Sequence, residues 1–395
     1  MNKIKITIIS NYLSPERGAA PNRITSLARE LAKQNHVEVV APLPNYPTGR
    51  IFDGYRHKVF LREDLGGFVA RRYWSYNSNS MNPVKRGVAM LSFGIMLFFE
   101  SGHFLKRKPQ IVIIQNSPLL VSFFGILVTK IFSRAKVVLN VSDLWPLSAL
   151  ELGVLRKGRF YSLLEKIELS NYRKSDIIVG QSEEILQHVV DLVPSKGTLL
   201  YRNVPNINVQ EKKRAKNKKL KLVYAGLLGV AQGVYEICTH LNFSELGVEF
   251  HVFGAGNEQT LIEQIAVPGS NIFFHGSVEV DELRQTLDQF DFAIVPLKNR
   301  IFGAVPSKVF EMSMLGIPMI FAGGGEGAEI INQYGLGLTS LPGDFAALRD
   351  NIKRAKSLSD TEYNVLVENC FATSSVHFNF KGQIQNLNSV LNDIK

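Results

Sequence analysis

The sequence is poor in cysteine: its 395 residues include only two, Cys238 and Cys370. Two thiols cannot build a disulfide framework or a four-cysteine zinc site, so cysteine-stabilised folds are excluded and a reducing, cytoplasmic compartment is favoured. The first ten residues also lack a long apolar run, because Lys3 and Lys5 precede only a short stretch, far below the core of a signal peptide. That stretch instead predicts a first buried strand.

Long apolar segments are missing as well. Two uncharged stretches, Val88 to Phe99 and Pro118 to Val128, are twelve and eleven residues long, below the ~18 residues that span a bilayer. The second stretch predicts a buried core helix. The first lies between Lys85-Arg86 and Lys106-Arg107-Lys108, and two interpretations stay open: a buried helix, or an interfacial helix that dips into anionic lipid.

Acidic residues are scarce in the first half of the chain. Residues 1–200 carry 27 Lys/Arg against 15 Asp/Glu, whereas residues 201–395 carry 18 against 20, so the excess behind the net charge of +10 lies in the N-terminal half. Such a half usually faces nucleic acid, an anionic membrane or a phosphorylated substrate. No zinc-finger, RRM or recognition-helix pattern accompanies the charge, which argues against nucleic acid.

Short apolar runs alternate with helical stretches, a pattern that is typical of parallel α/β sheets. A chain of this length is long for one core and comfortable for two domains, which we expect at residues 1–205 and 221–377. Residues 206–220 are rich in Lys and Arg and lack apolar periodicity, which predicts a solvated hinge. The loop after the first strand lacks a full GxGxxG pattern, which argues against a dinucleotide cofactor.

The most informative stretch is a short helix predicted at residues 307–315. Ser307 after a proline marks its start, and Gly316 with a nearby proline marks its end. The charges oppose the helix dipole, because Lys308 lies in the first turn and Glu311 follows it. A bound phosphate would make Lys308 favourable there, and Glu311 could accept hydrogen bonds from a sugar diol. The alternative is a solvated lysine and a glutamate paired elsewhere on the surface.

This stretch resembles the donor-site helix of glycosyltransferase family 4, whose members are retaining enzymes with the GT-B fold. The family usually carries two glutamates separated by seven residues; Glu311 matches the second, and Gly303 stands at the position of the first. The Pro-Ser-Lys opening, residues 45–49 (NYPTG) and the Asp-Leu-Trp-Pro run from Asp143 resemble the WbuB-like branch of O-antigen and capsule synthesis. The resemblance implies an α/β fold of two Rossmann-like domains facing across a donor/acceptor cleft, with a final helix at 378–395 that packs back on the first domain.

The resemblance also assigns donor-site residues in the second domain. Family 4 enzymes hold the donor diphosphate on the glycine loop that here contains Gly226, Gly229 and Gln232, the last near the position of a usual lysine. The loop at Gly276 is expected to frame the base of the nucleotide. Arg300 is a second candidate for contact with an anion, and the alternative is an ordinary surface arginine.

Two candidates lie in the first domain. Gly18 belongs to a loop that, in family 4, approaches the donor phosphate or the acceptor. Asp143 follows a predicted strand and is a candidate contact of donor or acceptor, although it could equally be the N-cap of the next helix. Many family 4 enzymes place histidines at these strand ends, and this chain has none there.

The expected chemistry needs no metal and no cofactor. The sequence has no Asp-X-Asp triplet, the metal clamp of the other main glycosyltransferase fold, and no His/Cys/carboxylate cluster with metal-ligand spacing. The leaving group would then be stabilised by the helix dipole, by backbone N–H groups and by Lys308. The resemblance implies retention without an enzymic nucleophile, and Lys308, Glu311 and Asp143 are the candidate catalytic residues.

The resemblance implies transfer of a sugar, such as an N-acetylated or deoxy-amino sugar, from a UDP-sugar to a lipid-linked saccharide in O-antigen, capsule or lipopolysaccharide biosynthesis. The protein would be peripheral on the inner face of the cytoplasmic membrane. Two alternatives stay open. A UDP-sugar 2-epimerase shares the fold but needs acid/base carboxylates and histidines; a catalytically silent nucleotide-sugar-binding protein is suggested by Gly303.

Overall fold

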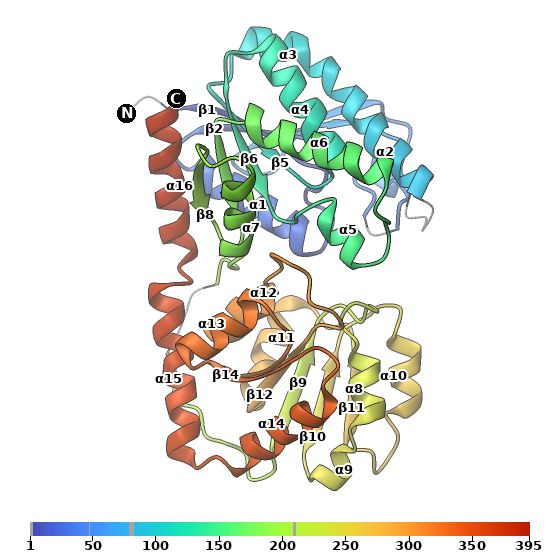
Figure 1. Ribbon diagram of the computed structural model, residues 1–395, viewed down its shortest axis with the longest axis vertical. Helices are drawn as coiled ribbons and strands as arrows, with labels where there is room; N and C mark the ends of the chain where they lie inside the picture. Colours follow the sequence, from blue (N-terminus) through green and yellow to red (C-terminus); the bar gives the residue numbers. More distant parts are fainter. Residues whose placement is uncertain (1–2, 47, 79–82, 208–210) are drawn as a thin grey trace. The chain divides into compact units, whose positions relative to one another are not determined.

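The computed structural model describes residues 3–46, 48–78, 83–207 and 211–395 of the chain. The chain folds into two compact units (Figure 1): unit 1 comprises Met1–Asn203 and Phe380–Lys395, and unit 2 comprises Val204–Asn379. Each unit contains a largely or wholly parallel sheet with helices packed on it. The α/β class expected from the sequence is therefore confirmed.

Unit 1 holds an eight-stranded sheet in the order β3-β4-β2-β1-β5-β6-β7-β8. All neighbouring strands are parallel except β3 and β4, which pair antiparallel. The strands are β1 (Lys5–Ile9), β2 (His36–Pro42), β3 (Phe60–Asp64), β4 (Val69–Tyr73), β5 (Ile111–Gln115), β6 (Lys136–Val141), β7 (Ile177–Gly180) and β8 (Gly197–Leu200).

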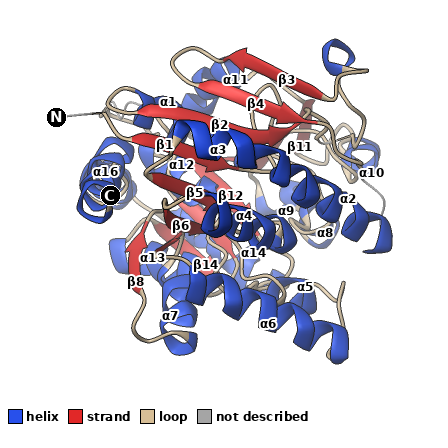
Figure 2. Cartoon of the chain, turned by 90° about the horizontal axis from the view of Figure 1, so that it is seen from above, coloured by secondary structure: helices blue, strands red, loops and turns tan. Residues whose placement is uncertain are grey.

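The helices of unit 1 include a C-terminal helix that returns from unit 2 and packs on the first helix. Asn35, just after α1, donates a hydrogen bond of 3.1 Å from Nδ2 to Oδ1 of Asn388 in α16, and Figure 2 shows both helices beside β1. On the sheet, α4 packs between α2 and α6. The helices are α1 (Ala19–Ala32), the 3-10 helix η1 (Asp53–Tyr55), α2 (Pro83–Met96), η2 (Leu97–Glu100), α3 (Ser101–Arg107), α4 (Leu119–Phe132), α5 (Leu147–Glu151), α6 (Arg159–Lys174), α7 (Glu183–Leu192) and α16 (Phe380–Ile394).

Unit 2 holds a six-stranded parallel sheet in the order β11-β10-β9-β12-β13-β14. Its strands are β9 (Lys221–Ala225), β10 (Glu249–Phe253), β11 (Ile272–Gly276), β12 (Phe292–Pro296), β13 (Met319–Ala322) and β14 (Gly337–Ser340). Its helices are α8 (Val234–His240), α9 (Phe243–Leu246), α10 (Gln259–Ile265), α11 (Val280–Thr286), η3 (Leu287–Gln289), α12 (Ser307–Met314), α13 (Glu326–Tyr334), α14 (Phe345–Ser357) and α15 (Asp360–Val376).

The central strands of both sheets are apolar because helices cover both of their faces. All five residues of β5 (IVIIQ) and of β12 (FAIVP) are buried, the continuous pattern that two-sided burial requires. In parallel sheets the loops that follow the strands gather at one edge, where ligands usually bind. The predicted site residues are therefore expected at this edge in each unit.

The apolar helix of unit 1 is longer than the sequence predicts. Helical structure continues from α2 through η2 and α3, and Gly87–Arg107 is 21 residues long. An 18-residue window within it has a mean hydropathy of 1.5, so the helix is long and apolar enough, by length and composition, to cross a membrane. Glu100 accepts a hydrogen bond of 2.8 Å from Arg71 Nε on β4, and His103 Nε2 lies 2.7 Å from Glu38 on β2. These contacts hold the helix against the sheet of unit 1.

The expectation of a solvated hinge does not hold for the second half of residues 206–220. Arg214 is buried, and its guanidinium donates hydrogen bonds to the carbonyl groups of Asp288 (3.1 Å) and Leu315 (3.5 Å). Asn217 donates its backbone N–H to Asp291 Oδ1 at 2.9 Å. The basic composition suggested a solvated segment. Instead, Arg214 donates hydrogen bonds to several backbone carbonyl groups and thereby docks this part of the chain onto unit 2.

Replacing Arg214 with Met should destabilise unit 2 by about 2 kcal/mol or more, because buried carbonyl groups lose a charged donor. The control is Lys213→Met, since Lys213 is the exposed neighbour. Hydrogen exchange of the β9 and β12 amides measures the effect in unit 2. Both tryptophans, Trp74 and Trp145, lie in unit 1, so urea unfolding followed by tryptophan fluorescence should barely change. Equal exchange in the two variants would contradict the docked role.

Candidate functional site

The glycine loop and α12 meet at the carboxyl edge of the unit 2 sheet. β9 and β12 are paired neighbours; β9 ends just before Gly226, and β12 leads through residues 297–306 into α12. A Cβ atom placed on Gly226 would lie only 2.4 Å from Nζ of Lys308. The ammonium group therefore rests directly on the glycine backbone. Two residues that the sequence assigned to one site, 82 positions apart in the chain, are in contact.

Helix α12 itself begins at Ser307, as its sequence predicts. The preceding residue, Pro306, is extended, and no side chain caps the helix N-terminus. At the other end Gly316 has φ +65°, and its N–H bonds to the carbonyl of Ser313 at 3.0 Å. Uncapped N–H groups leave the partial positive charge of the helix dipole free to act on an anion.

Lys308 is a half-buried cation without a matched acceptor. Burial lowers the pKa of its ammonium group, and the negative charge of Glu311 opposes that shift. Nζ lies 5.8 Å from the centre of the Tyr224 ring, and within the described residues it makes no hydrogen bond or ion pair. A desolvated ammonium group with three unused donors is a ready partner for phosphate.

Glu311 lies one turn deeper in α12 and is also half-buried. In the part of the chain that the structure describes, its carboxylate forms no hydrogen bond and no ion pair at close range. It nevertheless acts on Lys308 through its charge. Both oxygens are therefore available as acceptors for the hydroxyl groups of a ligand.

Three glycines at the ends of β9, β10 and β11 pack backbone against backbone. Gly226 N donates to Phe253 O at 2.9 Å, and Gly254 N donates to Gly276 O at 2.7 Å. A Cβ atom on Gly254 would lie 1.8 Å from Gly226 O, so any side chain at residue 254 would displace the loop that carries Gly226. The structure thus links Gly276, expected near the base, to the loop under Lys308.

Gln232 lies in the same loop, but its amide does not replace the missing lysine. Its Oε1 is buried without a hydrogen-bond partner, and a Cβ atom on Gly229 would lie 2.8 Å from this oxygen. Oε1 offers an acceptor, whereas a phosphate requires a donor; turning the amide by 180° would present its N–H₂ group. Gln232 also lines a pocket with Lys298 and Phe345, which neither Lys308 nor Glu311 lines.

Arg300 and Gly303 lie in the segment that leads from β12 to α12. Arg300 is exposed; its side chain lies 3.4 Å from the Cβ position of Gly324, and its guanidinium carbon lies 6.0 Å from the centre of the Phe302 ring. Gly303 is buried with φ +81°, a conformation that disfavours other residues. The departure from the family glutamate therefore coincides with a backbone position that favours glycine.

The two candidates of unit 1 occupy different local settings. Burial raises the pKa of Asp143, while a hydrogen bond from Ser148 opposes the shift. The residue at the N-cap of α5 is Pro146, with no side-chain cap, so Asp143 is not the N-cap that the sequence left open. Gly18 is the N-cap of α1, and a Cβ atom there would lie 3.3 Å from the Tyr46 ring.

The sequence did not reveal Tyr224, the last but one residue of β9. Its ring lies beneath the Lys308 ammonium group, and its hydroxyl donates a hydrogen bond of 2.6 Å to Leu227 O in the glycine loop. The only available signal was an aromatic residue just before the loop. Among the described residues, no group of three or more His, Cys, Asp or Glu side chains could hold a metal ion; the metal-independent reaction stays a prediction.

Comparison with known proteins shows a family match in unit 2 and solved structures with a similar fold. Residues 213–357 match the family model described as glycosyl transferases group 1. Sucrose-phosphate synthase from Thermosynechococcus elongatus has a similar structure, with a TM-score of 0.72, 12% identity and coverage of 99% of both chains. Anabaena Alr3699/HepE in complex with UDP gives a TM-score of 0.70 and 13% identity over 99% of this chain and 100% of that chain.

The E. coli trehalose-6-phosphate structure bound with UDP-2-fluoro glucose gives a TM-score of 0.68 and 11% identity, over 98% of both chains. A search of curated protein sequences found no match. These similarities define the GT-B fold, and the family model covers most of unit 2. The chain thus has the GT-B fold of these structures. More particularly, unit 2 carries a group 1 glycosyl transferase domain.

Replacing Gly254 with Ala should destabilise unit 2 by about 2–4 kcal/mol, because the new methyl group overlaps Gly226 O and the backbone is strained. The matched control is Gly324→Ala, whose Cβ would meet only the flexible Arg300 side chain at 3.4 Å. Hydrogen exchange of β9 and β10 amides measures the loss. A Gly254 variant as stable as the Gly324 variant would show that the loops do not pack as described.

Proposed function

We propose that this protein is a retaining glycosyltransferase that transfers a sugar from a UDP-sugar to a lipid-linked saccharide. One observation carries the proposal: the unpartnered ammonium group of Lys308 rests on the glycine loop of a group 1 glycosyl transferase domain. The choice of uridine is supported by structurally similar proteins whose structures contain UDP or UDP-2-fluoro glucose. A nucleoside diphosphate supplies the anion that Lys308 lacks.

In this proposal the donor lies along the carboxyl edge of the unit 2 sheet. Its diphosphate is held by the Lys308 ammonium group, the uncapped N-terminus of α12 at Ser307 and the backbone of the loop from Gly226 to Gly229. Glu311 accepts hydrogen bonds from the ribose hydroxyl groups. The loop at Gly276 frames the base, and Arg300 is the second anion contact.

The same groups promote departure of the leaving group. The bond between the sugar C1 and the diphosphate oxygen breaks, and negative charge develops on the phosphate, where Lys308 and the α12 dipole stabilise it. The acceptor oxygen bonds to C1 on the same face, and its proton passes to the departing phosphate. The proposed reaction therefore uses neither an enzymic nucleophile nor a metal, and Asp143 contacts donor or acceptor.

The acceptor and the location are proposed from the surface of unit 1. Val88, Leu91, Ile95 and Phe99 recur at every third or fourth position of the apolar helix and are 40–67% exposed. Exposed lysines stand near its two ends, at positions 85, 106 and 108. An apolar stripe between cations fits an anionic bilayer surface, so we place the protein peripherally on the cytoplasmic face of the membrane, where it builds O-antigen or capsule repeats.

The direct test of the function incubates the protein with a panel of UDP-sugars, with and without a diphosphate-linked lipid saccharide. The expected result is a new glycosidic bond that keeps the anomeric configuration of the donor. An epimerised UDP-sugar without acceptor would favour an isomerase instead. Binding of UDP-sugar with no turnover on any lipid-linked acceptor would favour a silent binding protein.

Lys308→Met should weaken UDP binding by roughly 1.5–3 kcal/mol, or about 10- to 150-fold, because a charge-assisted contact is lost. Isothermal titration calorimetry measures this effect. Affinity of the unmodified protein should also fall as pH rises through the lowered pKa of Lys308, since only the ammonium form binds phosphate. The control is Lys298→Met, an exposed lysine paired with Glu236 at 2.6 Å. Unchanged affinity in the Lys308 variant would remove Lys308 from the site.

Replacing the three lysines at 85, 106 and 108 with Gln should release the protein from anionic liposomes, with about 1 kcal/mol lost per cation near the surface. Arg107 is kept, because it forms an ion pair with Glu38 and donates a 2.8 Å hydrogen bond to His36 O. The control replaces Lys213, Lys218 and Lys353, all exposed in unit 2. Equal sedimentation of both triple variants with vesicles would place the membrane contact elsewhere.

A further inference from the structure

An exposed aromatic ring lies where the loops after β1 and β2 meet. Tyr46 is 37% exposed. Its ring lies edge-to-face with Tyr12, with centroids 5.5 Å apart and an interplanar angle of 76°. On another side it lies 3.3 Å from the Cβ position of Gly18. The small residue at position 18 therefore leaves room for the ring, and two neighbouring loops hold it.

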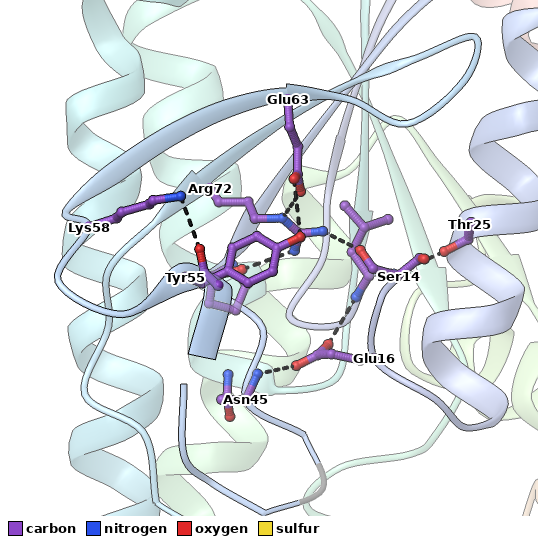
Figure 3. Close-up of polar contacts among 11 residues, drawn as sticks. Ser14, Glu16, Thr25, Asn45, Tyr55, Lys58, Glu63 and Arg72 are labelled. Carbon is purple, nitrogen blue, oxygen red and sulfur yellow. Dashed lines mark hydrogen bonds and ion pairs between the residues drawn. The ribbon is translucent and has the colours of Figure 1, made fainter. Parts of the chain in front are cut away.

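A buried carboxylate ties these loops together. Glu16 is only 3% exposed. Its Oε1 accepts hydrogen bonds from the backbone N–H groups of Asn45 and Tyr46, both at 2.8 Å, and its Oε2 accepts one of 3.1 Å from Leu13 N. Figure 3 shows Glu16 between the segment at Ser14 and the segment at Asn45. One side chain of the β1 loop thus fixes the backbone that carries the Tyr46 ring.

A buried cation ties the same two segments together. Arg72 of β4 is fully buried, and its guanidinium donates to Ser14 O in the first loop and, at 3.3 Å, to Pro42 O at the end of β2. The guanidinium also pairs with Glu63 of β3 (Figure 3). Buried charges are costly unless fully bonded. Here Glu16 and Arg72, two buried groups of opposite charge, both join the loop after β1 to the end of β2 and the loop that follows it. The structure therefore fixes these two loops relative to each other.

The chemistry around the ring selects a class of ligand. A partly exposed tyrosine that contacts the protein on two sides offers a flat apolar face, and its side chain has few rotatable bonds to order on binding. One face of a pyranose ring is lined by C–H bonds and stacks on such a surface, while its hydroxyl groups stay at the rim. Backbone N–H groups donate to both oxygens of Glu16, so its carboxylate acts on the position of the ring.

We propose that Tyr46 is the stacking platform for a sugar ring of the acceptor, and that Glu16 is a positioning residue that fixes this platform. The inference rests on the proposed function, since it assumes that unit 2 binds the donor and that a saccharide accepts the transferred sugar. It adds the residue that contacts the acceptor and the feature of the acceptor that is recognised, namely the face of a neutral sugar ring.

The test measures sugar binding directly and needs no turnover. Saturation-transfer NMR with free glucose and N-acetylglucosamine is recorded on the full chain in the presence of UDP. Tyr46→Ala should weaken binding of the better ligand about tenfold, equivalent to ~1.4 kcal/mol, whereas Tyr46→Phe should keep it within about twofold because the ring remains. Phe273→Ala, which removes a 40% exposed ring from unit 2, is the control and should have no effect.

Glu16 is tested by its coupling to the ring. Glu16→Gln places an amide N–H₂ group against backbone donors, so it should weaken sugar binding by about the same factor as Tyr46→Ala while leaving UDP affinity unchanged. The double variant should bind no more weakly than Tyr46→Ala alone, which a general loss of stability would not produce. Additive losses would overturn the positioning role.

The platform itself is overturned if Tyr46→Ala binds sugar as the unmodified protein does, or if the unmodified protein binds UDP but neither sugar. Failure of the proposed function is a separate result, in which the unmodified protein binds no UDP at all. Measuring UDP affinity by calorimetry for every variant keeps the two outcomes distinct.

Discussion

The ammonium group of Lys308 pressed against the backbone of Gly226 is the contact on which the site in unit 2 depends. Glycine at position 226 leaves room for this contact, since a methyl group there would overlap Nζ unless the lysine side chain moved. The contact also requires Gly254, because the carbonyl of Gly226 occupies the space of a side chain there. A lysine desolvated in this way is unfavourable until an anion joins it. In the proposed function, the donor diphosphate removes this local instability.

Most of the fold could be predicted from the sequence because apolar runs with turn residues mark buried parallel strands. The buried strand expected within the first ten residues is β1 (Lys5–Ile9), and the helix expected at residues 307–315 is α12 (Ser307–Met314). The hairpin of β3 and β4 was missed, since Arg71 and Arg72 interrupt its apolar pattern. Arg72 is nevertheless fully buried. The sequence alone cannot distinguish a buried arginine that donates to carbonyl groups of distant residues from an arginine exposed to solvent.

Some residues of the candidate site could be predicted from local sequence signals, whereas others are placed by contacts between distant parts of the chain. Lys308, Glu311 and Gly226 could be selected because helix signals and a glycine loop are local features of the chain. The contact of Tyr224 with Lys308 depends on the packing of a loop on a helix some eighty residues away, which no local pattern encodes. The bonds of Glu16 to residues 45 and 46 are non-local in the same sense.

Charged groups whose hydrogen-bonding atoms are used by the protein act as positioning groups, whereas charged groups without such partners can bind a ligand. In unit 1, Glu16 and Arg72 are buried and their hydrogen-bonding atoms are used by the protein itself. Such charges fix a conformation and have little capacity left for a ligand. In unit 2, Lys308 and Glu311 are half-buried on successive turns of one helix, without hydrogen-bond partners among the described residues. A partly buried charge without hydrogen bonds is stabilised by any ligand group that supplies them. A nucleotide carries a phosphate, which suits Lys308, close to a ribose diol, which suits Glu311.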